Sequence, residues 1–499
     1  MIGPIELLVG FGAAFTLVWP GTWLFRRLAP YIGLLDIPNP RSSHGIPIPR
    51  AGGIVFVALV PLVALVIAYW KGITLAGGEW ALLLTGWFIA GVSLIDDWRS
   101  LPARVRLVAQ AWAAVGLIVY GGYLHYFGAG GFGVIDVGWL GVLITFVWII
   151  GLANAFNFMD GMDGLAAGQG MIAALAVAWL SMRIGLGWMA VMSATMAGGM
   201  FGFLLHNAPP ARVFMGDVGS IWIGFTFAGL AVLGAARGEE RLSVGFWILL
   251  LGVFLLDTGL TLTRRVLQGE PVLQAHRTHY YQRLLRVGWG HRRVTGLYLI
   301  MAALLATVAV VHFDFIRLRF TTLVVIGLLT FGGTFSLVHY VERYKAQLEA
   351  AHGLELAHVV AAGLRRPMKR FLRRWGISML LEAIIIVASY ATAFLLRFAW
   401  DIGAASFFYL GLRDGIIAIV FVHLTLNAAL GVYMRRIHVV STVITMRYAA
   451  AAAAGGFALM VGEILLGPVR AIPLSVLGVG SMLSCTGFLV LRYLRLVKR

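Results

Sequence analysis

Six aspartates of this chain stand where apolar runs end, a costly place for a carboxylate unless it is paired, hydrated or coordinating a ligand. They lie in the segments "LIDDWRSLPARVRLVAQ" (94–110), "NAFNFMDGMDGL" (154–165), "FMGDVGS" (214–220) and "DTGLTLTRR" (257–265), as Asp96, Asp97, Asp160, Asp163, Asp217 and Asp257. Carboxylates at helix ends offer the hard oxygen ligands that Mg²⁺ takes, usually one or two of them together with water and substrate phosphates. The aspartates therefore point to magnesium-assisted chemistry on a phosphate.

Cationic and amide side chains accompany these carboxylates. Arg41, His44 and Arg50 stand in "LLDIPNPRSSHGIPIPRAGG" (34–53), and His276 and His279 stand in "AHRTHYYQRL" (275–284). Guanidinium groups present a planar fork to phosphate, and histidine is a neutral or cationic donor near neutral pH. Asn154 and Asn157 can hydrogen-bond a carboxylate or a base edge. Together these residue types describe phosphoryl transfer, in which catalysis is mainly positioning and charge neutralisation.

The elements that position these residues must be membrane helices. At 60% hydrophobic and 12% charged residues with a mean hydropathy of +0.90, the 499-residue chain is more apolar than a soluble core requires. We expect an all-α polytopic membrane protein with about fifteen transmembrane helices of about 20 residues, eleven before the polar stretch 341–375 and four after it. The spans are predicted near 2–24, 53–70, 80–95, 106–124, 139–154, 165–182, 188–206, 219–236, 242–263, 295–312, 320–340, 376–396, 410–433, 448–467 and 471–491.

The basic residues predict the orientation, because Lys and Arg gather in short cytoplasmic loops. With the amino terminus outside and the carboxyl terminus cytoplasmic, these spans put about 30 of the 39 Lys and Arg residues inside and about 9 outside. All six aspartates then project to the cytoplasmic face. We assign the net charge of +18 to the inner leaflet and to substrate electrostatics, and expect no nucleic-acid partner.

Five motifs occur in a fixed order along the first two thirds of the chain. They are "DxPxxR..H..P.PR.GG", "DD", "NxxNFxDGxDGLA", "FMGDxGS" and "HRxHxxQRL". This order resembles the polyprenyl-phosphate N-acetylhexosamine-1-phosphate transferases, a superfamily that includes the phospho-MurNAc-pentapeptide translocase and the enzymes that initiate O-antigen and teichoic acid linkage units. The resemblance covers about residues 1–340.

The resemblance implies a reaction at the cytoplasmic face of the bacterial inner membrane. A UDP-activated amino sugar, either GlcNAc or a 6-deoxy-N-acetylhexosamine, gives its sugar 1-phosphate to undecaprenyl phosphate and releases UMP, which initiates an O-antigen or capsule-type polysaccharide. The implied cofactor is Mg²⁺, with Mn²⁺ as an alternative, and a homodimer is the family-based expectation.

Residue roles also follow from the family's pattern. Asp217 would be the leading Mg²⁺ ligand with Asp97, and Asp96 and Asp97 would lie near the lipid phosphate, one of them as a base. Asp160 and Asp163 would complete the catalytic floor, and Asn157 would hold the nucleotide. His276, Arg277 and His279 would contact the diphosphate. For Asp257 two interpretations stay open, a functional carboxylate and a hydrated helix end.

The last third of the chain calls for a separate module. Residues 341–370 mix charges with helix formers and lead into a basic cluster, which predicts a cytoplasmic linker on anionic lipid. Residues 371–499 resemble the four-span anchor of capsule-type nucleotide-sugar 4,6-dehydratases, with Glu382, Arg397 and Phe398 at the matching places. We expect a four-helix membrane module without a catalytic domain, which either docks a sugar-modifying enzyme or only packs.

Two other function classes remain as alternatives. A polytopic transporter or lipid flippase of the same pathway would also carry intramembrane acids, but transporters place them near the bilayer midplane within repeated halves. A scaffold without catalysis leaves the one-sided clustering of the aspartates unexplained.

Overall fold

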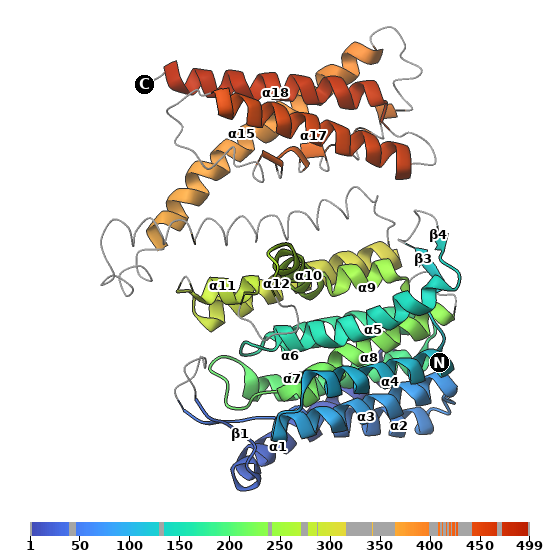
Figure 1. Ribbon diagram of the computed structural model, residues 1–499. Helices are drawn as coiled ribbons and strands as arrows, with labels where there is room; N and C mark the ends of the chain where they lie inside the picture. Colours follow the sequence, from blue (N-terminus) through green and yellow to red (C-terminus); the bar gives the residue numbers. More distant parts are fainter. Residues whose placement is uncertain are drawn as a thin grey trace. The chain divides into compact units, whose positions relative to one another are not determined.

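The structure is a computed structural model, which describes residues 2–38, 46–128, 134–237, 242–270, 278–286, 288–315, 342, 365–398, several positions between 408 and 427, 442–466 and 472–497. The chain divides into two compact units (Figure 1). The first comprises Met1–Leu285 and Trp289–Arg317, and the second comprises Arg286–Gly288 and Leu318–Arg499.

The all-α, multi-pass prediction is confirmed. The described residues contain ten helices long and apolar enough to cross a membrane, or eleven if one bent pair is a single span, and two shorter apolar helices, Ile54–Trp70 and Tyr448–Met460. These thirteen coincide with thirteen of the predicted spans. The span predicted at 320–340 and much of that at 410–433 lie outside the described residues, so the total of fifteen and the orientation stay predictions.

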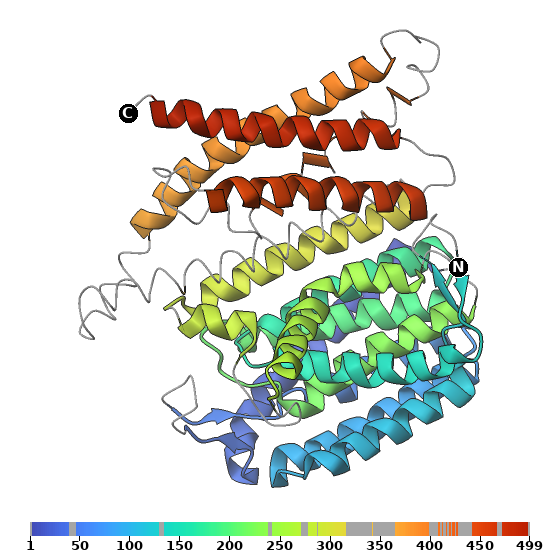
Figure 2. The same ribbon diagram turned by 45° about the horizontal axis from the view of Figure 1, so that its top comes forward.

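In its described residues the first unit is a helix bundle with two short hairpins (Figures 1 and 2). Its helices are α1 (Pro4–Leu28), η1 (Ala29–Ile32), α2 (Ile54–Trp70), α3 (Gly77–Arg99), α4 (Ala103–Gly121), α5 (Leu140–Met159), α6 (Leu165–Arg183), α7 (Gly187–Asn207), α8 (Gly216–Ala236), α9 (Val244–Leu250), α10 (Gly252–Leu267), α11 (Tyr280–Arg286), α12 (His291–Val310) and η3 (Val311–Phe315). Strand β1 (Leu35–Asp36) pairs antiparallel with β2 (Ile48–Pro49), and β3 (Tyr126–Gly128) pairs antiparallel with β4 (Val134–Asp136).

Helix α8 is the centre of this bundle. Every residue from Val218 to Gly234 is buried, and α2, α3, α4 and α5 pack around it. Its glycines permit this closeness, since a Cβ on Gly224 would lie 2.5 Å from the carbonyl oxygen of Leu152 on α5. The carboxyl ends of α3 and α5 and the amino end of α8 therefore meet at one end of the bundle.

The loop before α2 is tied to the start of α8 by backbone hydrogen bonds. The N–H groups of Gly52 and Gly53 donate to the carbonyl oxygens of Phe214 and Met215, at 2.9 Å each. A Cβ on Gly53 would lie 2.5 Å from the Cα of Gly219, so only glycine lets the two segments approach this closely. This contact brings the basic first loop to the "FMGD" segment.

The span predicted at 242–263 is present but is not one continuous helix. Two helices, α9 and α10, bend by 84° at Leu251, directly before Gly252. Glycine weakens a helix locally, and α10 beyond the break carries a carboxylate, Asp257, that bonds to α11 and α12. The glycine inside the apolar run "FWILLLGVFLL" was the available signal.

The second unit contains α15 (Arg365–Phe398), α17 (Thr442–Leu466) and α18 (Leu474–Val497). Both α15 and α17 pack against α18, around an apolar core that includes Ile386 and Val476. Glu382 on α15 is buried and accepts hydrogen bonds from Asn427 and Tyr448. The predicted domain boundary at 340 and residues 343–364 of the linker lie outside the described residues, and the resemblance to a dehydratase anchor stays a prediction.

Candidate active site

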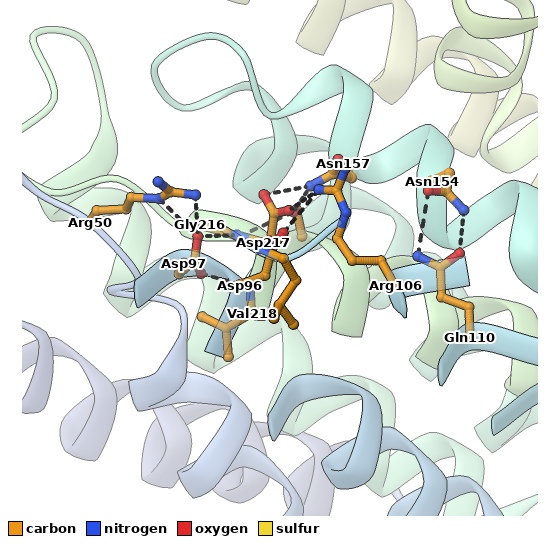
Figure 3. A network of polar contacts seen from close by, with 12 residues as sticks. Arg50, Asp96, Asp97, Arg106, Gln110, Asn154, Asn157, Gly216, Asp217 and Val218 are labelled. Atoms are coloured by element: carbon orange, nitrogen blue, oxygen red, sulfur yellow. Dashed lines mark hydrogen bonds and ion pairs between the residues drawn. The ribbon is translucent and has the colours of Figure 1, made fainter. Parts of the chain in front are cut away.

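The amino end of α8 carries the centre of the candidate site (Figure 3). Asp97, near the end of α3, accepts hydrogen bonds from the backbone N–H groups of Asp217 at 3.1 Å and Val218 at 3.0 Å. It thus satisfies two of the N–H groups that a helix start leaves unpaired, where a negative charge is favoured. Gly216 precedes them with a φ of +76°, a conformation that glycine adopts without strain.

Arg50 completes the surroundings of Asp97. Its Nε and Nη2 atoms lie 2.9 and 2.8 Å from Asp97 Oδ1. The Asp97 side chain is fully buried, while that of Arg50 is one-third exposed. In all four of these contacts an N–H group donates to Asp97. The Asp97 carboxylate therefore joins α3, α8 and the first loop.

Asp96 and Asp217 face each other across a shared arginine, Arg106 on α4. Its Nη1 atom lies 2.9 Å from Asp96 Oδ2 and 3.1 Å from Asp217 Oδ2. Asp96 also accepts the Leu101 N–H at 2.5 Å. The second oxygen of Asp217 accepts a hydrogen bond from Asn157 Nδ2 at 2.9 Å. Helices α3, α4, α5 and α8 thus each contribute one polar side chain to a single cluster (Figure 3).

Asn154 lies one helical turn from Asn157 but outside this cluster. Its Nδ2 atom donates to Gln110 Oε1 at 2.6 Å and to the Ile150 carbonyl oxygen at 2.8 Å. Figure 3 shows the Asn154–Gln110 pair beside the aspartates and not among them. Its described contacts join α5 to α4.

The loop 160–164 between α5 and α6 brings two more carboxylates. Burial raises the pKa of Asp160 well above its ordinary value, and the negative charges of Asp217, Asp97 and Asp163 raise it further. Among the described residues the Asp160 side chain has no hydrogen bond or ion pair. Asp160 is therefore the carboxylate of this cluster that most needs a positive partner.

Asp163 differs because it is already held in place. It accepts the Ala211 N–H at 3.0 Å, and His291 Nδ1 lies 3.4 Å from its Oδ1 atom. Burial alone would raise its pKa, but the nearby His291 ring and the hydrogen bond from Ala211 outweigh burial and lower the pKa below its ordinary value. Its carbonyl oxygen accepts the Thr295 hydroxyl, so it also anchors α12.

His279 is buried at the start of α11. Its Nδ1 atom lies 3.2 Å from Asp257 Oδ1, and its ring stacks on that of Tyr281. Asp257 is itself buried, so the interpretation of it as a hydrated helix end is wrong. Arg41, His44, His276 and Arg277 lie outside the described residues, and their roles stay predictions.

Three polar residues of this region are not among those that the sequence motifs indicate. Arg106 lies in "PARVRL", where it is one of several basic residues that follow the predicted span 80–95. Gln110 and His291 had no motif around them. The spacing of Arg106 from Asp96 was the available signal, since a helix hairpin can bring residues ten apart together across its turn.

Comparison of the sequence with known proteins places this chain in a family. The model of "Glycosyl transferase family 4" matches residues 79–235, from the start of α3 to the end of α8. A probable undecaprenyl-phosphate N-acetylglucosaminyl 1-phosphate transferase of Bacillus subtilis is 31% identical over 298 residues, covering 59% of this chain and 82% of that protein. The chain belongs to glycosyl transferase family 4.

Other relatives are enzymes whose names give a different lipid acceptor or a different transferred sugar. A decaprenyl-phosphate N-acetylglucosaminephosphotransferase of Mycobacterium tuberculosis is 33% identical, covering 67% of this chain and 89% of that protein. A phospho-N-acetylmuramoyl-pentapeptide-transferase of a Synechococcus strain is 33% identical, covering 54% and 80%. The predicted resemblance to polyprenyl-phosphate sugar-1-phosphate transferases is confirmed at the level of the superfamily.

Proposed function

We propose that this protein transfers an N-acetylhexosamine 1-phosphate from a UDP-sugar to undecaprenyl phosphate, with UMP as the second product. The observation that carries the proposal is the cluster in which Asp96, Asp217, Asn157 and Arg106 converge from four helices at one end of the bundle. The relatives named as polyprenyl-phosphate N-acetylglucosamine 1-phosphate transferases support the same reaction class.

The carboxylates of the site fit a divalent cation that binds together with substrate phosphates. The cluster gathers five aspartates, Asp96, Asp97, Asp160, Asp163 and Asp217, against two arginines, Arg50 and Arg106, so a doubly charged diphosphate would meet net negative charge. Among the described residues no group of three or more acidic, histidine or cysteine side chains forms a metal cage by itself. One or two carboxylates plus phosphate oxygens and water is the set that Mg²⁺ prefers.

We assign Asp217 and Asp160 as the carboxylates that would hold Mg²⁺ (or Mn²⁺). When bound, the cation would offset the charge of the diphosphate and of the transition state. Asn157 fixes the orientation of the Asp217 carboxylate, and Arg106 holds Asp96 beside it. Asp97 keeps the start of α8 and Arg50 in place, so we assign it an organising role and not that of a metal ligand or base.

In the transfer step, an oxygen of the lipid phosphate forms a bond to the β-phosphorus of the donor. The bond from that phosphorus to the bridging oxygen breaks, and UMP leaves with the electron pair. Because the attacking phosphate is already ionised at neutral pH, no side chain has to remove a proton from it. The residues of the cluster act by positioning the substrates and by charge, and the positive charges of Arg50 and Arg106 would attract the phosphate groups.

The biological setting is part of the proposal. We assign the site to the cytoplasmic face of a bacterial inner membrane and the product to the initiation of a cell-surface polysaccharide. GlcNAc is the first donor sugar to test, since two relatives are named for it, and the 6-deoxy-N-acetylhexosamines are the second.

The test is transfer by the purified protein in detergent, with undecaprenyl phosphate, Mg²⁺ and a panel of UDP-N-acetylhexosamines. UMP release and lipid-linked product are followed together, with Mn²⁺ and chelator arms. Equal amounts of both products from one donor, lost on chelation, would support the proposal. No product from any donor, with the lipid shown to be bound, would refute it in favour of a transporter or flippase.

A further inference from the structure

Asp257 on α10 is a buried carboxylate that joins three helices. Its Oδ1 atom accepts the Tyr280 N–H at 3.0 Å and lies 3.2 Å from His279 Nδ1. Its Oδ2 atom accepts the Tyr281 N–H at 3.2 Å and the Tyr298 hydroxyl of α12 at 2.7 Å. The side chain is 3% exposed, so these protein groups replace the water that a carboxylate needs. A purely structural helix cap would not require the contact to His279.

The contact fixes which ring nitrogen of His279 carries a proton. A carboxylate oxygen can only accept, so Nδ1 must be an N–H donor. Nε2 is then an acceptor in the neutral ring and a second donor in the protonated ring. Carboxylate–histidine pairs of this kind set the tautomer and orientation of a ring that acts elsewhere. The described contacts of the ring include Asp257 from α10, Tyr281 from α11 and Phe158 from α5.

The same carboxylate also reaches the loop that carries Asp160. It holds the backbone of Tyr281, whose hydroxyl donates to the Phe158 carbonyl oxygen at 3.0 Å near the end of α5. A Cβ on Gly161 would collide with that hydroxyl, so Tyr281 lies directly against the loop. Asp257 is thus linked both to His279 and to the segment of the aspartate cluster between α5 and α6.

We propose that Asp257 is a positioning residue of the active site. It holds His279 with Nδ1 protonated, so that Nε2 is the ring nitrogen that meets the UDP-sugar, and it keeps Tyr281 against residues 158–161, where α5 ends and the loop begins. The assignment of His279 to the donor diphosphate rests on the proposed function, whereas the tautomer of His279 follows from the contacts alone. A phosphate oxygen can bond to Nε2 only when that nitrogen also carries a proton, and the Asp257 charge then balances the ring.

The first arm of the test is ¹⁵N NMR of the histidine-labelled wild-type protein, with the His279 signals assigned by their loss in His279→Gln. We expect the signature of a protonated Nδ1, either alone or with a protonated Nε2. A neutral ring protonated at Nε2 alone would overturn the proposal. This arm needs no activity, so it decides the tautomer even if the transfer assay fails and the proposed function with it.

The second arm compares Asp257→Asn with a matched control, Thr261→Val, which removes only a 3.4 Å contact to the same carboxylate. We expect Asp257→Asn to raise the KM for the UDP-sugar about tenfold and to leave the KM for the lipid phosphate within about twofold. Thr261→Val should leave both unchanged. A variant that lowers kcat alone, as partial unfolding would, or an unchanged donor KM, would refute the positioning role.

Discussion

The two carboxylates Asp97 and Asp160 allow a sharp test, because the same substitution should move stability in opposite directions. Asp97→Asn keeps the shape of the side chain but puts an NH₂ group where one oxygen was. Three donors converge on Oδ1 and one, the Val218 N–H, on Oδ2. The asparagine loses fewest hydrogen bonds when its amide oxygen replaces Oδ1 and its NH₂ group replaces Oδ2. The NH₂ group then faces the Val218 N–H, so the hydrogen bond from Val218 to the carboxylate is lost, and Arg50 loses its counter-charge.

The size of the effect follows from these contacts. A hydrogen bond to a charged group contributes about 1.5–3 kcal/mol, and the ion pair with the one-third exposed Arg50 adds about 1 kcal/mol after solvent screening. We expect Asp97→Asn to lower the free energy of unfolding by about 3 kcal/mol and the Tm by about 3–6 °C for a unit of this size.

Asp160→Asn should act the other way. Folding raises the pKa of Asp160, so the protein loses stability as the pH rises from the unfolded-state pKa, about 3.9, through the folded-state value. An amide carries no charge and escapes this penalty. We expect Asp160→Asn to have a Tm similar to that of wild type below about pH 4, where the carboxyl is largely protonated in both states, and higher by about 1–3 °C at pH 8, while transfer activity falls at least a hundredfold.

The assay is thermal unfolding of the detergent-solubilised protein by intrinsic fluorescence at several pH values without divalent cation, alongside UMP release with Mg²⁺. Two results would refute the reasoning. One is Asp97→Asn with unchanged Tm, which would mean that the described contacts of Asp97 do not hold α8. The other is Asp160→Asn that is less stable than wild type at every pH, which would mean that Asp160 has a structural partner.

Three further predictions concern the cluster and its loop. Asp217→Ala should abolish Mg²⁺-dependent UMP release with an unchanged elution profile, and full activity would remove Asp217 from the metal site. Arg106→Ala should lower kcat about a hundredfold, because it leaves Asp96 and Asp217 side by side without their shared cation, and an unaffected kcat would contradict the bridging role. Gly161→Ala should lower activity, because the added methyl group would collide with the Tyr281 hydroxyl. Adding Tyr281→Phe to the same chain should restore part of the activity, since the ring carbon Cζ lies 3.3 Å from the added methyl group. Equal loss in the single and double variants would argue against that contact.

Much of the architecture could be predicted from the sequence because a membrane imposes one rule on every span. Each helix must satisfy its own backbone in lipid, so apolar runs of suitable length identify helices one by one. The family could be predicted for a different reason: the five ordered motifs keep the residue types that the chemistry needs at fixed places along the chain.

The sequence could not assign partners within the site. Asp96 and Asp97 are adjacent, yet they sit on different sides of the α3 end, one on Arg106 and the other on Arg50 and α8. Which neighbour serves which role depends on how α4 and the first loop fold back, and no local pattern encodes that return.

The bend between α9 and α10 and the burial of Asp257 were likewise decided by tertiary structure. A carboxylate in an apolar run can lie at a hydrated helix end or in a buried position. Only the packing of α11 and α12 against α10 supplies the four hydrogen-bond donors that offset the desolvation of the buried carboxylate. The amino-acid sequence alone indicates which residues could do the chemistry and that they stand at helix ends. Tertiary packing decides which of them touch, because hydrogen bonds act over about 3 Å while the residues that form them here lie as many as 121 positions apart.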